Sequence, residues 1–389
     1  MLQAGNPVDI IAVYAHIPFC AAKCNYCSFN SYAGLEALHH EYVQALCTEV
    51  ARSPRSRGAF SAGSIYVGGG TPTVLEVGLL GRVLQTCTRC YPLLPGAEIT
   101  VEANPGTVNP AYLSQLRSLG VNRLSLGVQS FAQPMLALLG RIHTGQQARD
   151  TFLLARDQAF DTINLDLIYG LPGQGLLQWL EDLSTAIELR PEHLSLYCLS
   201  LDEGTALARS VAAGDLPEPD ADLAAAMYEL AEARLEEAEY VHYEISNWAL
   251  PGHECRHNLS YWRNVPYLGF GAGAHSFDGQ GRSWNVARPD EYIGRLDVGE
   301  SPVTGRETID RAREMSETLI MGLRLCNGVL FVEFEERFGL PLREVYGSQI
   351  GDLVQLGLLD VDAHGVRLTN RGRLLGNEVF ERFLPEASG

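Results

Sequence analysis

The stretch YAHIPFCAAKCNYC, residues 14–27, decides how the rest of this chain is interpreted. It places Cys20, Cys24 and Cys27 in one short loop directly after a β-branched, aliphatic run. A [4Fe-4S] cluster normally takes four cysteine ligands, so three thiolates leave one iron open to a small molecule. The amino and carboxylate groups of S-adenosylmethionine (SAM) can fill that position, and the reduced cluster can then cleave SAM to a 5′-deoxyadenosyl radical. The spacing therefore predicts a [4Fe-4S] cluster that carries SAM.

A zinc site is the alternative interpretation of these cysteines. Structural zinc prefers four closed ligands, so the site would have to recruit His16 or His39. A CxxxC spacing without a second CxxC pair is poor for such a site. The separate pair Cys87 and Cys90 lies within a predicted helix, where we expect ordinary thiols, because a redox-active pair needs a helix N-terminus.

Composition limits the classes of protein and partner. The chain has 389 residues, 46% of them hydrophobic and 20% charged, which suits one large globular domain with a smaller one. A net charge of -18 argues against nucleic acid as a partner. Nine cysteines, an odd number, point to reduced thiols rather than a disulfide framework. Because neither a signal peptide nor a membrane-spanning stretch is visible, we expect a cytoplasmic protein with no more than peripheral membrane contact.

Short aliphatic runs alternate with amphipathic helical stretches over the first half of the chain. We expect strands at Ile10–His16, Ser64–Val67, Glu98–Glu102, Arg123–Gly127, Thr162–Ile168 and His193–Leu199. Helices are expected between them, among them Leu35–Arg52, Pro110–Leu119, Gln146–Gln158 and Leu176–Leu189. Six such units predict an α/β fold, a partial (β/α)6 TIM-like barrel, with a doubly wound open sheet as the alternative.

The pattern changes after Pro217. Asp220–Glu239 is expected to form one long helix, and Tyr240–Trp284 to be an irregular segment rich in aromatic residues. Three helices, a hairpin and a last helix then follow, in an order that resembles a winged helix. The helices are expected at Ile309–Leu325, Phe331–Phe338 and Leu342–Leu356, the hairpin strands at Leu358–Val361 and His364–Leu368, and the last helix at Asn370–Phe383. Acids and bases are about balanced here, which favours a packing or partner domain over DNA binding. We predict a barrel domain over 1–285 and a small C-terminal domain over 300–389.

Polar residues and glycines gather at the predicted strand ends, where barrel enzymes build their sites. The GGGTP motif, residues 68–72, ends the second strand and is expected to expose N–H groups to an anion such as the SAM carboxylate. Glu102, Gln129, Asp166 and Ser200 lie at other strand ends. Each alone could equally be a helix cap or a turn bond, but together they suit an amino group, a ribose and an adenine.

Several motifs in this order resemble the radical-SAM family of oxygen-independent coproporphyrinogen III dehydrogenase. They are YAHIPFC with CxxxCxxC, GGGTP, VEANP at 101–105, LGVQS at 126–130 and DLIYGLP at 166–172. The resemblance implies that Tyr14, Gly69 and Glu102 hold the cluster-bound SAM. It also implies that positions around a second SAM are occupied by Tyr26, Gly70, Thr71, Gln129, Arg141, Asp166 and Ser200.

Two departures separate this chain from the dehydrogenase pattern. Phe29 stands where that pattern has a further cysteine, and only 19 residues precede Cys20. The motif HNLSYW, residues 257–262, instead resembles the HNxxYW motif of the family's heme chaperone branch, and GAGAHS follows at 271–276. The resemblance implies a protein that binds heme and transfers it to acceptor apoproteins, with the dehydrogenase activity as the rival function. A purely structural metal-binding module would leave the strand-end residues without a purpose.

The residues of this segment are compatible with heme binding. His257 could ligate heme iron, with His253, Cys255 and His275 as further candidates in 240–285. Flat apolar surface could come from Trp248, Tyr261, Trp262, Tyr267 and Phe270. The alternative is an aromatic-packed loop in which the histidine and asparagine satisfy buried backbone groups.

Overall fold

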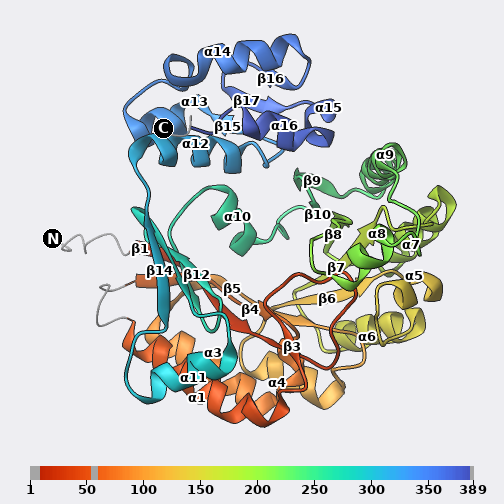
Figure 1. The fold of residues 1–389 in the computed structure, drawn as a ribbon, viewed down its shortest axis with the longest axis vertical. Coiled ribbons are helices and arrows are strands. Elements are labelled where there is room, and N and C mark those ends of the chain that lie inside the picture. The colour runs from red at the N-terminus through yellow and green to blue at the C-terminus, as the bar shows by residue number, and fades with distance from the viewer. Residues whose placement is uncertain (1–8, 54–59, 386–389) are drawn as a thin grey trace.

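The computed structural model describes residues 9–53 and 60–385. Six parallel strands lie side by side in chain order and form the predicted barrel wall (Figure 1). They are β1 (Asp9–Ile17), β4 (Phe60–Gly69), β5 (Leu93–Ala103), β6 (Arg123–Gln129), β7 (Thr162–Tyr169) and β8 (His193–Cys198). The six βα units and the α/β class are confirmed. β-branched and aliphatic side chains form these strands because they pack well on a pleated surface covered by helices.

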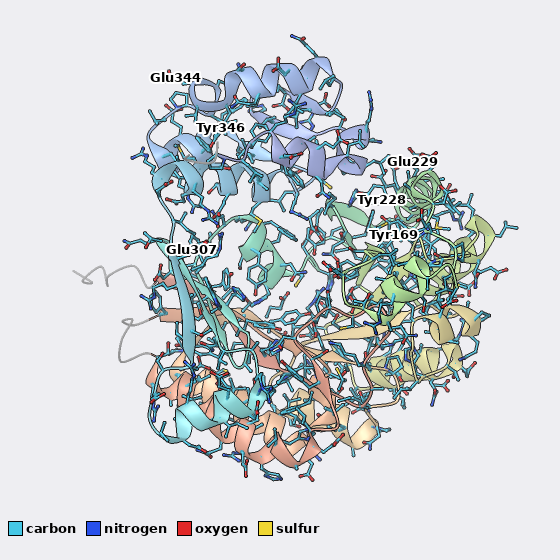
Figure 2. The ribbon with its side chains drawn as sticks, viewed as in Figure 1. Tyr169, Tyr228, Glu229, Glu307, Glu344 and Tyr346 are labelled. Atoms are coloured by element: carbon cyan, nitrogen blue, oxygen red, sulfur yellow. The ribbon has the colours of Figure 1, made fainter. Side chains whose placement is uncertain are left out.

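Helices follow the parallel strands and cover the outside of the barrel (Figure 1). They are α1 (His39–Arg52), α3 (Val77–Cys90), α4 (Pro110–Ser118), α5 (Gln133–Leu138), α6 (Gly145–Asp157), α7 (Leu176–Leu189), α8 (Ala206–Ala212) and α9 (Ala221–Glu237). Local sequence explains their starts: Asn109 caps α4 ahead of a proline, and Thr144 and Gln147 form a capping box on α6. Across the barrel wall, Tyr169 of β7 packs against Tyr228 of α9 with ring centroids 6.4 Å apart (Figure 2).

The aromatic segment expected to be irregular adds strands to both edges of this sheet, so that prediction is wrong. β9 (Val241–Glu244) and β10 (Asn247–Ala249) continue it beyond β8. Beyond β1 come β11 (Tyr267–Phe270), β12 (His275–Phe277) and β13 (Gly281–Asn285), and then β14 (Val303–Thr308), which follows the aromatic segment. Except for the parallel β1–β11 pair, these added strands pair antiparallel. The pattern was missed because strands of three to six residues carry little periodic signal.

Two helices accompany the added strands. The shorter, α10 (Arg256–Trp262), contains the HNLSYW motif, and α11 (Pro289–Asp297) packs against α1. In Figure 1, α10 lies between the barrel and the C-terminal domain. The motif is therefore helical, rather than the loop that the sequence suggested.

The C-terminal domain has its own core. Helices α12 (Arg311–Gly322), α13 (Phe331–Phe338) and α14 (Leu342–Gln355) pack with a three-stranded sheet of β15 (Val329–Leu330), β16 (Leu359–Val361) and β17 (Gly365–Leu368). The expected last helix is two helices, α15 (Asn370–Leu374) and α16 (Gly376–Glu381), divided at Leu375. Strand β14, inside the predicted range 300–389, belongs to the large sheet, and its Glu307 (Figure 2) pairs with Arg313 of α12 at 3.0 Å.

One further observation concerns membranes. Among the helices in 9–53 and 60–385, none combines the length and the apolar character needed to span a bilayer.

Candidate functional site

A cavity of about 400 Å³ opens at the carboxyl ends of the parallel strands. Twelve of the residues singled out from the sequence line it: Cys20, Cys24, Tyr26, Cys27, Gly69, Gly70, Thr71, Glu102, Gln129, Arg141, Asp166 and Ser200. They come from segments far apart in the chain, and the βα order brings them together because all parallel strands end on the same side. Tyr14 and His257 are not among the lining residues.

The cysteine loop is held in place by its neighbours. Between β2 (Phe19–Cys20) and β3 (Tyr32–Ala33), the Asn25 N–H donates to Leu139 O at 2.9 Å, and the Leu207 N–H donates to Asn25 O at 2.8 Å. Ser28 adds a hydroxyl bond to the Asp202 carboxylate at 2.6 Å. The loop is thus anchored to the β6–α6 and β8–α8 connections, which keeps the three thiols at the cavity.

Each of the three thiol sulfurs has a polar neighbour. Thr71 Oγ1 donates to Cys20 Sγ at 3.6 Å, and an Arg141 N–H donates to Cys24 Sγ at 3.4 Å. Cys27 Sγ lies 3.7 Å from Ser31 Oγ. Burial raises the pKa of Cys20, so its thiolate gains from such donors and from bound iron. Three partly exposed thiols with polar neighbours at their sulfurs fit a cluster in which each cysteine binds one iron.

The zinc alternative finds no fourth ligand here. Both ring nitrogens of the buried His16 are engaged, with Tyr14 Oη at 2.9 Å and Asn30 O at 2.9 Å. The His39 ring packs on Phe19 with centroids 4.5 Å apart. Within the part of the chain that the structure describes, no three His, Cys, Asp or Glu side chains converge on one ion position.

The GGGTP turn holds the cysteine loop. Gly69 has φ +120°, and a Cβ there would lie 2.6 Å from the His16 ring. At Gly70 a Cβ would meet Phe19 O at 2.6 Å and Cys20 Sγ at 2.9 Å, so only glycine fits. The N–H groups of Gly70 and Thr71 donate to Ile17 O and Phe19 O, and that of Gly69 to the Glu102 carboxylate. The expectation that these N–H groups face an anion is not met, since each already has a partner in the protein.

Two carboxylates face the cavity from inside the barrel. Glu102 accepts from Tyr66 Oη at 2.8 Å and from the Gly69 N–H at 3.0 Å, and burial raises its pKa to about 7. Asp166 accepts from Ser125 Oγ at 3.2 Å and Asn164 Nδ2 at 2.8 Å, and burial raises its pKa as well. Carboxylates that lose solvation in this way gain most from a bound cation, such as an amino group.

The remaining lining residues show strain and polar contacts. Gln129 has φ 69°, in the left-handed region that only glycine enters without strain, and such strain often marks functional sites. Besides Cys24, the Arg141 guanidinium donates to Asn104 Oδ1 at 2.6 Å and Gly127 O at 2.5 Å. Ser200 is exposed and donates to Asp202 at 2.9 Å.

Sequence reasoning missed Tyr66, Asn104 and Asp202, which all line the cavity. Tyr66 stands two residues before GGGTP and Asn104 lies inside VEANP, so the same strand-end argument could have found both. Asp202 carried no local signal, because its role depends on a contact with Ser28, 174 residues away.

His257 occupies the opposite end of the barrel. It is 1% exposed, with Nδ1 2.9 Å from Ser64 Oγ and Nε2 2.9 Å from Tyr261 Oη. Burial lowers its pKa to about 3, so the ring is neutral. In this conformation neither ring nitrogen is free, so the structure does not present His257 as a heme ligand. The alternative of an aromatic-packed loop is met only in part: the ring is buried among aromatic residues, but its partners are side-chain hydroxyls rather than backbone groups, and the motif is helical.

Its neighbours are also engaged. Trp248 and Phe270, expected to offer flat surface, are buried in the core, whereas Tyr261, Trp262 and Tyr267 are partly exposed. His253 Nδ1 lies 2.8 Å from Thr162 Oγ1. Burial raises the pKa of Cys255 to about 12, which disfavours the thiolate that iron would need.

His275 and the CxxC pair complete the set of predicted residues. His275 is exposed at the start of β12, and its ring stacks on Trp284 with centroids 5.8 Å apart. Cys87 and Cys90 lie at the end of α3, away from the cavity lining. Burial raises the pKa of Cys87, which fits the ordinary thiol expected there.

Comparison with known proteins agrees with this arrangement. Residues 14–186 match the Radical SAM superfamily, and residues 309–375 match the HemN C-terminal domain. A protein named heme chaperone HemW from Bacillus subtilis is 37% identical, over 96% of this chain and 99% of that protein. Its namesake from Escherichia coli is 36% identical, over 97% and 98%.

A mammalian protein and a solved structure extend the comparison. The mouse protein named radical S-adenosyl methionine domain-containing protein 1, mitochondrial, is 34% identical over 96% of this chain and 87% of its own length. The structure of Escherichia coli HemN, described as a coproporphyrinogen III oxidase and a radical SAM enzyme, superposes with a TM-score of 0.84 at 26% identity. That superposition covers 98% of this chain and 91% of HemN. The chain therefore belongs to the radical SAM superfamily and, within it, to the HemW family.

Proposed function

We propose that this protein binds heme and passes it to acceptor apoproteins, and that it carries a [4Fe-4S] cluster and SAM. The observation that carries the proposal is the 37% identity, over nearly the whole chain, to proteins named heme chaperone HemW. The gathering of three thiols and two buried carboxylates around one cavity supports the cofactor part. When bound, the cluster supplies an electron to SAM, and that radical chemistry belongs to the cofactor.

The chain's own residues would bind and orient the cofactors. Cys20, Cys24 and Cys27 would hold three irons, and Arg141 would donate toward the Cys24 sulfur and so tune the cluster. Glu102, with its raised pKa, would accept the SAM amino group. Asp166 and Ser200, which also line the cavity, offer oxygens for hydroxyl groups. Tyr14, Tyr26, Gly69, Gly70, Thr71 and Gln129 keep the SAM-binding roles that the family resemblance implies.

Oxygen-independent coproporphyrinogen III dehydrogenase activity is the second candidate, favoured by the close superposition on HemN. Against it stands Phe29, where the dehydrogenase pattern has a further cysteine. The Phe29 ring is 68% exposed and lines the cavity, so an apolar ring occupies that position beside the cluster loop. We therefore expect no turnover of coproporphyrinogen III.

The heme site is proposed to lie in segment 240–285. His257 is the ligand that the resemblance implies, and its use requires the hydrogen bonds to Ser64 and Tyr261 to break. His275 needs no such rearrangement, because its neutral ring is already exposed on β12. Imidazole from either residue is a common axial ligand.

A heme titration tests this function. The anaerobically reconstituted wild type is titrated with heme and followed by visible absorbance, beside His257→Ala, His275→Ala and Cys20→Ala. We expect about one heme per chain, a spectrum altered in one histidine variant, and uptake that survives the loss of the cluster. Unaltered spectra in both histidine variants, or SAM-dependent decarboxylation of coproporphyrinogen III in a parallel assay, would overturn the proposal.

We further propose that the protein acts in the cytoplasm, with heme-accepting apoproteins as partners and with peripheral contact to a membrane where those acceptors reside. The proposed division is a radical SAM domain over 1–285 and a C-terminal domain over 300–389. Expression of a fluorescent fusion, followed by cell fractionation, tests the location.

A further inference from the structure

The HNLSYW motif closes the barrel at the end opposite the cavity. Helix α10 and the residues just before it contact the strands: Glu98 of β5 accepts from the N–H groups of Arg256 and His257, and Arg123, the first residue of β6, donates to His253 O. On its other side, Trp262 lies under the Arg324 guanidinium of the C-terminal domain, 5.1 Å from the ring centroid. The motif therefore joins the closed end of the barrel to the C-terminal domain.

Inside the barrel, the His257 ring touches residues that lead to the cavity. Its centroid is 5.0 Å from that of Tyr66, with 31° between the ring planes. Tyr14 packs on both rings, with centroids 6.3 Å from His257 and 6.2 Å from Tyr66. The hydrogen bonds to Ser64 and Tyr261 hold the His257 ring in this orientation. Ser64 and Tyr66 are alternate residues of β4, so both side chains point to the same face.

Tyr66 extends this contact to the cavity. Its hydroxyl donates to Glu102 Oε1 at 2.8 Å, and both residues line the cavity. The pair is tightly confined, because a Cβ on Gly68 would lie 2.8 Å from the Tyr66 ring and 2.9 Å from the Glu102 carboxylate. The Gly69 N–H holds the other oxygen, Oε2. Any shift of the Tyr66 ring would therefore change the position of the carboxylate.

We propose that His257 is a positioning residue of the SAM site: its ring holds Tyr66 so that the tyrosine hydroxyl orients Glu102 in the cavity. The motif at the closed end thereby supports cofactor binding through β4, without touching the cofactor. This inference rests on the proposed SAM site, and it gives His257 a role in the heme-free protein that differs from heme ligation.

A double-mutant cycle on SAM affinity tests the proposal. Wild type, His257→Ala, Tyr66→Phe and the double variant are reconstituted anaerobically, and SAM binding is followed by calorimetry and by the electron paramagnetic resonance spectrum of the reduced cluster. We expect each single variant to bind SAM about ten-fold more weakly, the usual order for a lost hydrogen bond to a charged group. The double variant should be no weaker than the weaker single one, because both act on Glu102 along one path. Iron content should be unchanged.

Controls separate positioning from general destabilisation. Phe334→Leu, in the core of the C-terminal domain, should lower the melting temperature and leave SAM affinity unchanged. If His257→Ala does not fold, His257→Gln keeps an amide for Ser64 and removes the ring, and it should show the same loss. Multiplying effects in the double variant, or unchanged affinity in the His257 variants, would overturn the inference. A wild type that does not respond to SAM would instead refute the proposed SAM site.

Discussion

At the cavity end of the barrel, three thiols are partly exposed, Ser200 is exposed, and Glu102 faces open space with a pKa raised to about 7. At the closed end, two buried histidines are fully paired. His257 and His193 each have both ring nitrogens in hydrogen bonds, and burial holds the pKa of each below its usual range. Polar groups that line a cavity and can still accept or donate hydrogen bonds indicate a ligand site. Polar groups whose hydrogen bonds are all made within the protein stabilise the fold instead.

The two ends are connected, and the closed end supports the open one. His257 reaches Glu102 through Tyr66, and His193 reaches Asp166 through Asn164, which bonds His193 Nδ1 at 2.6 Å and Asp166 at 2.8 Å. Each of the two cavity carboxylates is thus connected to a buried imidazole through one intervening side chain. A motif that matters for function can therefore lie where no ligand reaches, because it orients the groups that do.

The largest expected effect comes from removing a cluster ligand at the cavity end of the barrel. Cys24→Ala removes one of the three thiolates, so the anaerobically reconstituted protein should lose its broad visible absorbance and its content of about four irons per chain. Cys87→Ala is the matched control, because that thiol is buried in α3 away from the cavity, and it should keep the cluster. A cluster retained in Cys24→Ala would contradict the ligand assignment.

A second prediction concerns a buried carboxylate on β9, next to the C-terminal domain. Glu244 is 0% exposed, and burial raises its pKa from 4.5 to about 7. Below pH 4.5 it is protonated whether folded or unfolded; between pH 4.5 and 7 only the folded state keeps the proton, so stability falls as pH rises. Glu244→Gln should therefore match wild type near pH 4 and be more stable by roughly 3 kcal/mol at pH 8.

Urea unfolding at the two pH values measures this difference. Glu229→Gln, an exposed change on α9 (Figure 2), serves as the control and should have no effect at either pH. A stability difference that does not depend on pH, or a variant less stable than wild type at pH 8, would show that Glu244 is ionised at no cost.

The smallest expected effect concerns a single hydrogen bond that anchors the cysteine loop. Ser28→Ala removes the hydroxyl that joins the loop to Asp202. Loss of one exposed hydrogen bond is worth about 0.5–1.5 kcal/mol, so the cluster should be lost to an iron chelator a few-fold faster. Thr48→Ala, on α1, removes an exposed hydroxyl that bonds only within its helix and should leave the rate unchanged. Equal rates in Ser28→Ala and wild type would mean that the other anchors hold the loop alone.

Much of the open end could be predicted from sequence, because its signals are local. The CxxxCxxC loop, the GGGTP turn and Glu102 each lie at or just past the end of a strand, and parallel strands end on one side. The closed end could not be predicted in this way. One of the two ring partners of His257 is Ser64, 193 residues away, and composition cannot tell whether Trp248 and Phe270 cover a ligand or fill a core. Strands β11 to β13 were missed because they are only three to five residues long, so their place depends on the pairing of β11 with β1 and of each further strand with its neighbour.

The most direct test of the central claim is the electron paramagnetic resonance spectrum of the reduced, reconstituted protein with and without SAM. If the three cysteines leave one iron open beside Glu102, adding SAM should change the spectrum, and Glu102→Gln should weaken that response. A wild-type spectrum indifferent to SAM would contradict the assignment of the cavity as a cluster and SAM site.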